Sequence, residues 1–433
     1  MLKAGWSRAD ITPPVGLDLC GFGGRPGPSA GVHDPLVAKA LCVSDGARGI
    51  ALITADLIGL DAATVAELRR RVCATLGEGA PALMVACSHT HSGPSTPCLP
   101  FLGRPDPTYL AGLNEALVGL VVEAWQARRE AQIGYGQAPA QVGINRRERL
   151  ADGRITLGRN DAGLTAPYVD VLRVETAAGC AVLFSHAAHP VTLGGDNVMI
   201  SGDWPGYAQR IAEAQLGERC LTLYGQGCCG DINSDAFGGF EVIEAQGRVV
   251  ADAVTSLVPS IPLAGDSGVA SASVVIDLPL QDPPPVEAAR ASLASHEQSR
   301  EAHFATDGYG LRIMREGMVD WARRVLALAE AGATDLTQPY EIQALRLGEG
   351  VIVGLPGEVF VSYQQQIKAC SPFAHTFVLA YANGNPGYVP TAAAFPEGGY
   401  EVDSAICCYG TTMLKPDCER LIVEAACRLL RGL

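Results

Sequence analysis

The chain has 433 residues, of which 48% are hydrophobic and 18% charged, and its formal net charge is −14. This composition is typical of a folded protein with a sizeable core and excludes a disordered chain. An acidic surface argues against a nucleic-acid partner, because nucleic-acid binding needs a basic face. Composition leaves open whether the chain forms a homo-oligomer.

The start of the chain shows no apolar stretch typical of a signal peptide. No window approaches the roughly 18 uninterrupted apolar residues of a transmembrane helix. We therefore expect a cytoplasmic protein without a transmembrane segment. In that setting the 14 cysteines favour reduced, buried thiols over a disulfide framework. The adjacent pairs Cys228–Cys229 and Cys407–Cys408 are unusual, and a structural role is the commoner one for such residues.

Apolar runs alternate with helical patterns in the first part of the chain. The runs, rich in Val, Ile and Leu, predict strands within 40–59, 82–88, 169–175, 180–189 and 220–227. Apolar residues at helical spacing predict helices over 61–78, 107–130, 205–217 and 241–257. This alternation indicates an α/β fold of mixed β-sheets flanked by helices.

A proline-rich segment, "DLPLQDPPPVEAAR", introduces the second part of the chain. Beyond it we predict a helical region over about 285–331, a hairpin over 340–359, a strand over 376–384 and an amphipathic closing helix over 415–433. Because strand patterns resume after the helical region, we interpret that region as an insertion. We therefore expect residues 1–433 to form a single catalytic domain.

Polar side chains follow several of the predicted strands. His89 and His91 follow "ALMVACS", His189 follows "AVLFSHAA", Glu358 follows "VIVGLPG", and Tyr388 lies beyond "TFVLAYANG". Ligand sites of α/β sheets lie beyond the carboxyl ends of the strands. Histidines and a carboxylate that converge there are suited to a divalent metal ion, and zinc is the first candidate.

Spacing alone also leaves structural alternatives for these residues. His89 and His91 are two residues apart and share one face of an extended chain, so one could bind metal and the other a substrate. A buried histidine is equally compatible with a hydrogen-bonded core residue. Glu358 could cap a following helix, and Tyr388 could be a packed aromatic residue.

Several motifs occur in a fixed order along the chain: "ADITPPVGLDLCGF", "HTHSGP", "AHPVTL", "SGDWPGYA", "GCCGDIN", "LPGEVF" and "GYVPT". Together they resemble the N-terminal catalytic domain of the neutral/alkaline (non-lysosomal) ceramidase family, in a short form without the C-terminal immunoglobulin-like domain. The resemblance covers nearly the whole chain. It implies a zinc-dependent hydrolase that cleaves a carbon–nitrogen (amide) bond of a small molecule through metal-activated water.

The resemblance also implies roles for individual residues. One zinc ion per chain would be held by His89, His189, Glu358 and Tyr388. The implied catalytic residues are His91, Tyr400 and Arg146. His91 and Tyr400 would face the scissile carbonyl, and His91 would relay a proton to the leaving amine.

The chain departs from the family pattern at the serine of "GD-x-S-P-N". Asn233 occupies the serine position, and Ser234 is shifted by one residue, so it would face the other way. With the short form and the missing secretion signal, this leads us to expect a substrate other than ceramide. An ester or lactone hydrolase on the same zinc site, and a catalytically inactive zinc-binding module, are the alternatives.

Ligand histidines usually donate their second ring nitrogen to a carbonyl or carboxylate. Asp56, Asp203 and Asp231 are candidates for this role, and helix capping or turn formation is the alternative for each. The basic run "RRER" at 146–149 could meet an anionic group, and a solvated loop is the interpretation that we favour.

Overall fold

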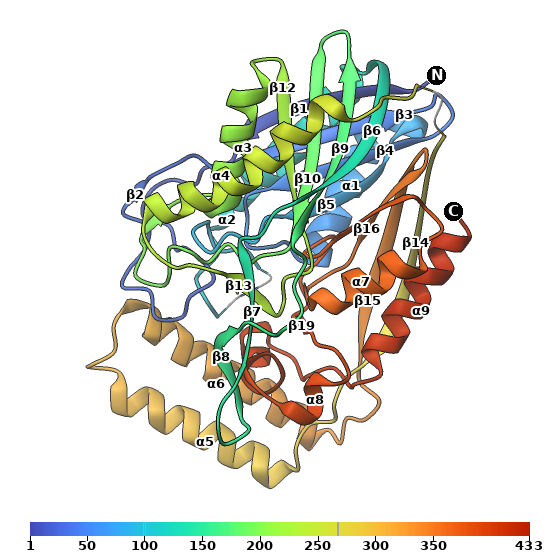
Figure 1. Ribbon diagram of the computed structural model, residues 1–433. Helices are drawn as coiled ribbons and strands as arrows, with labels where there is room; N and C mark the ends of the chain where they lie inside the picture. The colour runs from blue at the N-terminus through green and yellow to red at the C-terminus, as the bar shows by residue number, and fades with distance from the viewer. Residues whose placement is uncertain (98, 100, 266–267) are drawn as a thin grey trace.

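Two large β-sheets pack face to face, and helices cover their outer faces (Figure 1). The computed structural model describes residues 1–97, 99, 101–265 and 268–433. The described residues confirm a mixed α/β fold with sheets flanked by helices. No helix in these ranges is long and apolar enough to cross a membrane.

Eight strands form the larger sheet, and both antiparallel and parallel neighbours occur in it. In spatial order they are β12 (Cys220–Gln226), β10 (Gly179–His186), β9 (Tyr168–Thr176), β6 (Arg129–Pro139), β1 (Lys3–Asp10), β3 (Val37–Ser44), β4 (Gly49–Ala55) and β5 (Ala82–Cys87). The second sheet contains β14 (Val269–Pro279), β15 (Thr337–Leu347), β16 (Gly350–Gly354) and β18 (His375–Leu379).

Three smaller sheets and the helices complete the described fold. The small sheets pair β13 (Ile232–Ser234), β7 (Gly143–Arg149) and β8 (Ile155–Asn160); β11 (Met199–Ile200) and β2 (Gly31–Val32); and β17 (Glu358–Val359) and β19 (Tyr388–Val389). The α-helices are α1 (Ala62–Leu76), α2 (Pro107–Gln126), α3 (Asp203–Leu216), α4 (Phe240–Leu257), α5 (Val286–His303), α6 (Tyr309–Glu330), α7 (Val361–Cys370), α8 (Ala394–Glu397) and α9 (Cys418–Arg431). Short helical turns are η1 (Gly77–Gly79), η2 (Val258–Ser260), η3 (Tyr400–Ser404) and η4 (Ala405–Tyr409).

Side-chain alternation along the strands explains the layers. In β3, Ala40 and Cys42 belong to the core beneath the helices, whereas Leu41 and Val43 belong to the core between the two sheets. Successive side chains of a strand point to opposite faces, so each apolar strand serves two cores at once. This is why the strands read as continuous apolar runs rather than as alternating ones.

The sequence-based elements are confirmed in most of the chain. The predicted helices correspond to α1 to α6 and α9, and the hairpin turn at Gly348 joins β15 to β16. Two strands of the large sheet, β1 and β6, were not predicted. In β6, Gly134 and Gly136 interrupt the apolar pattern because a Cβ at Gly134 would lie 2.1 Å from the carbonyl oxygen of Pro262.

The α5–α6 pair connects two strands that are direct neighbours. β14 and β15 pair antiparallel from Val269↔Leu347 to Pro279↔Thr337, and the helices leave and re-enter the sheet between them. Figure 1 shows the helix pair at one end of the molecule, far from both chain termini. Gly317 of α6 packs on Phe101, where an added Cβ would approach the Phe101 side chain to 2.5 Å. A small residue is therefore required for α6 to dock.

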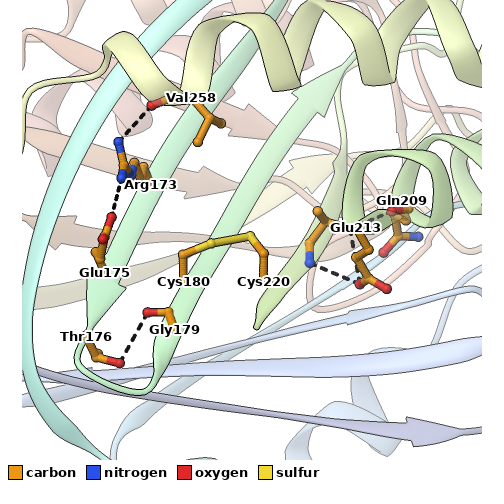
Figure 2. The surroundings of a disulfide bond; sticks show 10 residues. Arg173, Glu175, Thr176, Gly179, Cys180, Gln209, Glu213, Cys220 and Val258 are labelled. Atoms are coloured by element: carbon orange, nitrogen blue, oxygen red, sulfur yellow. Dashed lines mark hydrogen bonds and ion pairs between the residues drawn. A yellow bond between two sulfur atoms is a disulfide. The ribbon is translucent and has the colours of Figure 1, made fainter. Parts of the chain in front are cut away.

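Four of the described cysteines form disulfide bonds, so the expectation of reduced thiols is wrong for them. Cys180 of β10 is bonded to Cys220 of β12, its direct neighbour in the parallel register (Figure 2). Cys370, at the end of α7, is bonded to Cys427 of α9. Sequence spacing could not reveal these pairs, because 40 and 57 residues separate the partners and only the sheet and helix packing brings them together.

Two glycine substitutions inside helices should change stability in opposite directions. Gly317→Ala forces a methyl group against Phe101, and overpacking costs about 1–3 kcal/mol, which exceeds the gain of about 1 kcal/mol in helix propensity. Gly119→Ala in α2 meets no atom within 4 Å and should stabilise the protein by about 0.5–1 kcal/mol. Urea denaturation midpoints measure both. Equal effects of the two substitutions would contradict the tight docking of α6.

Candidate metal centre

The candidate ligands meet where parallel strands end. His89 follows β5, which runs parallel to β4, and His189 follows β10, which runs parallel to β12. Glu358 and Tyr388 lie beyond the ends of β16 and β18, which are also parallel, and the two residues are direct partners where the short strands β17 and β19 begin. The predicted convergence at the carboxyl ends of strands is therefore present, with four chain segments contributing one side chain each.

The facing atoms of these side chains are close enough to share one ion. His189 Nε2 lies 3.0 Å from Glu358 Oε2, and His89 Nε2 lies 3.7 Å from the same oxygen. Two ligands of one tetrahedral zinc ion, each at about 2.0–2.1 Å from the metal, are about 3.3 Å apart. Tyr388 completes the group, since its hydroxyl interacts with Glu358. The donor set thus fits zinc in both chemistry and spacing.

His91 belongs to the same cluster, so three imidazoles are candidates for the ion. The ligating nitrogens of His89, His91 and His189 all lie within 4.8 Å of one another, and His91 Nε2 lies 3.2 Å from His89 Nε2. A set of three histidines could hold a metal ion, with Glu358 and Tyr388 outside it. The distances alone do not decide whether the three histidines, or His89 and His189 with Glu358 and Tyr388, would bind the ion.

The second ring nitrogens distinguish His91 from the other two histidines. His89 Nδ1 faces the carbonyl oxygen of Ile58 at 2.5 Å, and His189 Nδ1 faces that of Cys229 at 2.6 Å. His91 Nδ1 is buried without a hydrogen-bond partner and packs on Gly21, where a Cβ would lie 2.4 Å away. Metal-bound histidines are usually oriented through their second nitrogen, which favours His89 and His189 as ligands.

Backbone carbonyls, not carboxylates, therefore orient His89 and His189, the candidate ligand histidines. The proposed role of Asp56, Asp203 and Asp231 is wrong. Each of these aspartates accepts a backbone N–H instead, from Val37, Trp204 and Val361 respectively. Asp203 and Asp231 thus bond backbone N–H groups at the starts of α3 and α7, as the capping alternative expects. Asp56 bonds the first residue of β3 instead, so neither capping nor turn formation explains it.

Burial and neighbouring charges set the protonation of the cluster. Burial lowers the pKa of His89 to about 3, so this imidazole is neutral and has a free nitrogen for a metal ion. Burial also lowers the pKa of His189, but Cys229 and Glu358 outweigh it and raise the value to about 9. Glu358 keeps its charge because the neighbouring imidazoles hold its pKa well below the usual range against the effect of burial.

Arg146 ties Tyr388 to the rest of the site. Its Nη2 donates to the Tyr388 hydroxyl at 2.8 Å, and its Nε donates to Glu401 at 2.8 Å. Arg147 donates to the other oxygen of Glu401, also at 2.8 Å. Both arginines are buried on β7, so the interpretation of this basic run as a solvated loop is wrong for them. The run meets an anionic group after all, but that group belongs to the protein.

Asn233 and Ser234 point in opposite directions, as the sequence predicted. Asn233 lines the cavity in front of the cluster, and its Oδ1 accepts a hydrogen bond from Arg146 at 3.1 Å. Ser234 is fully buried, and its hydroxyl donates to the carbonyl oxygen of His189. The hydroxyl at 234 therefore has a structural role, and the side chain that reaches the cavity here is an amide.

Two tyrosines that the sequence did not indicate also contact the cluster. Tyr381 stacks on His89 with ring centroids 3.9 Å apart, and its hydroxyl lies 3.4 Å from His189 Nε2. Tyr409 donates a hydrogen bond to Glu358 Oε1, the carboxylate oxygen that faces away from the histidines. Tyr381 has a positive φ of 51°, a backbone state that no sequence pattern near it predicts.

A cavity of about 890 Å³ opens in front of the cluster. Its lining includes His91, which follows β5, Arg146 of β7, Tyr388 of β19 and Tyr400 of η3. Its apolar wall contains Phe22, Leu102, Val191, Met314, Met318 and Trp321, and its polar wall on α5 contains Ser292, Ser295 and His296. The helices α5 and α6 thus provide part of the wall of this cavity.

Comparisons with known proteins identify a family and a fold. A model of the family described as neutral/alkaline non-lysosomal ceramidase, N-terminal, matches residues 2–241. The neutral ceramidase from Pseudomonas aeruginosa has the same fold, with a TM-score of 0.72 and 17% identity, over 100% of this chain and 75% of that one. A ceramidase structure described as complexed with C2 has a TM-score of 0.74 and 17% sequence identity, over 100% of this chain and 76% of that one.

A search of curated protein sequences finds no match. The two structural likenesses, at 17% identity, concern the fold alone. The family model carries the assignment, because it spans more than half of the chain and includes His89, His91 and His189. The chain belongs to the neutral/alkaline non-lysosomal ceramidase family.

Proposed function

We propose that this protein is a zinc-dependent hydrolase that cleaves an amide bond of a small molecule. The observation that carries the proposal is the convergence of His89, His189, Glu358 and Tyr388 at the end of a cavity that His91 and Tyr400 also reach. Zinc in such a site supplies Lewis acidity, which lowers the pKa of water and polarises a carbonyl oxygen.

We assign His89, His189, Glu358 and Tyr388 as the metal ligands. The backbone partners of His89 and His189 support this set over three histidines. Burial raises the pKa of Tyr388 far above its usual value, and Arg146 opposes that effect. A divalent cation at this point favours the phenolate strongly, so Arg146 and the ion would act together on Tyr388.

The remaining polar groups of the cavity have separate tasks. Burial raises the pKa of Tyr400, so its hydroxyl stays protonated and can donate to a carbonyl oxygen that gains negative charge. His91 is neutral, because burial lowers its pKa well below the usual value, so it offers one ring nitrogen as donor and one as acceptor, through which a proton can pass to a leaving amine. These two residues are not needed to bind metal, which argues against an inactive zinc-binding module.

The cavity favours an amide with at least one apolar arm. Leu157 and Phe237 line it and are 45% and 59% exposed, so apolar side chains continue to its rim. Asn233 supports the expectation of a substrate other than ceramide, because an amide stands where the family has a serine hydroxyl. An ester or lactone is compatible with the same donors and is tested beside the amides.

Two expectations from the sequence remain proposals. We propose that residues 1–433 form one catalytic domain with α5 and α6 as an insertion, and the direct pairing of β14 with β15 supports it.

The cytoplasmic location stays a prediction. The bonds Cys180–Cys220 and Cys370–Cys427 argue against it, since disulfides persist mainly in oxidising compartments.

An activity screen tests the proposed reaction. Protein stripped with a chelator and reloaded with zinc is offered N-acyl amides of increasing acyl length, ceramide, a lactone and an ester. We expect hydrolysis of at least one amide, lost on chelation and restored by zinc. Hydrolysis of esters or lactones alone would move the reaction to the alternative, and no turnover with zinc bound would indicate a binding module.

Tyr400→Phe is the matched variant in this screen. It removes one hydroxyl from the cavity and leaves the ligand set unchanged, so zinc content should stay constant. Loss of a single donor to a developing oxyanion lowers kcat about 100-fold or more. Full turnover by the variant would remove the role that we give to Tyr400.

Metal content of histidine variants separates the two ligand sets. We expect about one zinc per chain in the wild type and in His91→Ala, and strongly reduced content in His89→Ala, His189→Ala and Glu358→Gln. Elemental analysis after dialysis measures this, with His303→Ala on exposed α5 as control. Loss of zinc in His91→Ala together with retention in Glu358→Gln would establish the three-histidine set.

Tyr409→Phe tests how Glu358 is held. The variant removes the donor to Glu358 Oε1, so the carboxylate should lose its fixed orientation. Loss of such an outer contact lowers metal affinity about 10–100-fold. Competition with a chromophoric chelator measures the affinity, and Tyr309→Phe, whose hydroxyl bonds Asp18 away from the cluster, is the control. Equal affinities of Tyr409→Phe and wild type would contradict this role.

A further inference from the structure

Two adjacent thiols form part of the cavity wall. Cys407 and Cys408 lie on η4, line the same cavity as His91 and Tyr400, and have their sulfur atoms 4.0 Å apart. Both are partly exposed and neither is in a disulfide. The reaction proposed above uses neither thiol, so their presence here needs a separate explanation.

The other described cysteines differ from this pair. Cys228 and Cys229 are also adjacent in sequence, but both are fully buried. Cys73 is exposed and has no cysteine beside it in the sequence. Among the described residues that remain free thiols, Cys407 and Cys408 are thus the adjacent pair that a small molecule in the cavity can reach.

The spacing of the two sulfurs lies close to that of a shared centre. Two bonds of about 2.3 Å at a pyramidal atom, with an angle of about 95–100°, place two sulfurs about 3.5 Å apart, so the sulfurs at 4.0 Å need to approach by about 0.5 Å. A direct disulfide suits the pair less, because neighbouring Cα atoms are about 3.8 Å apart, below the range of about 4.4–6.8 Å that disulfides prefer. The hydrogen bond from Cys408 also lowers the pKa of the Cys407 thiol, which favours its nucleophilic form.

We propose that Cys407 and Cys408 form a dithiol site for a trivalent arsenical or a similar thiophilic centre, located in the wall of the substrate cavity. Such a centre needs two sulfurs and keeps its third substituent, whereas zinc would need further ligands. With hydrated phenylarsine oxide, two arsenic–sulfur bonds form and two arsenic–oxygen bonds break. The two thiol protons leave with the hydroxyl groups as two water molecules, and no oxidant is required.

An occupied dithiol site would also act on the metal centre. The phenyl group would fill cavity space beside Tyr400, and Tyr409, the next residue after Cys408, donates to Glu358. We therefore expect the arsenical to block turnover. This consequence rests on the proposed function, whereas capture of the arsenical does not.

Intact-mass spectrometry tests capture without any substrate. Wild-type protein is treated with phenylarsine oxide and then with excess glutathione, a monothiol that displaces singly bonded arsenic. One adduct per chain should survive in wild type and in Cys73→Ser, and 2,3-dimercaptopropanol should remove it. Cys407→Ser, Cys408→Ser and the double variant should each retain none, because a single sulfur cannot chelate.

A second measurement uses the unchanged protein. Bound arsenical should protect Cys407 and Cys408, and not Cys73, from alkylation, as peptide mapping shows. No surviving adduct in wild type, or protection that maps to other cysteines, would overturn the proposal. With a substrate in hand, the ratio of treated to untreated activity should fall at least tenfold in wild type and stay near one in the double variant. Capture without an effect on turnover would reject the inhibitory consequence and leave the dithiol site standing.

Discussion

The parallel pairing of Glu358 with Tyr388 is the constraint on which the site depends. β17 and β19 are only two residues long, yet their register places two candidate ligands side by side from positions 30 apart in the sequence. Gly230 packs on this pair, where a Cβ would lie 2.3 Å from the carbonyl oxygen of Glu358. The backbone therefore fixes the spacing of the two candidate ligands without any ion, which is what a preorganised centre requires.

Charge balance explains why so many ionisable groups tolerate burial here. Glu401 lies between Arg146 and Arg147, so this part of the site already pairs its charges. Glu358 and a phenolate at Tyr388 would match the two charges of a zinc ion. A buried charge without a partner costs several kcal/mol of folding free energy. A zinc ion would therefore neutralise the negative charges of Glu358 and Tyr388.

The sequence could predict the parts of the site that local patterns encode. His89, His189 and Glu358 follow apolar strands, and the carboxyl ends of strands are where such residues gather. No sequence pattern pointed to Tyr409, because its partner Glu358 is 51 residues away, far beyond the spacing that a helix or strand repeat relates. The same holds for the carbonyl oxygens of Ile58 and Cys229, since every residue has a carbonyl and only the fold selects which one faces a histidine. The basic run failed as a predictor because its partner Glu401 lies some 250 residues further along the chain.

The candidate ligands and much of the cavity wall come from different parts of this chain. The candidate ligands lie at strand ends that the two large sheets hold together, whereas Met314, Met318 and Trp321 reach the cavity from α6, which lies between β14 and β15 in the chain. A change in α5 or α6 can therefore alter the cavity wall without moving a candidate ligand. Since function resides in sites that a fold carries, membership of the family establishes the scaffold more firmly than it establishes the substrate. The wall of the cavity, including its two thiols, is where this chain can differ from its relatives.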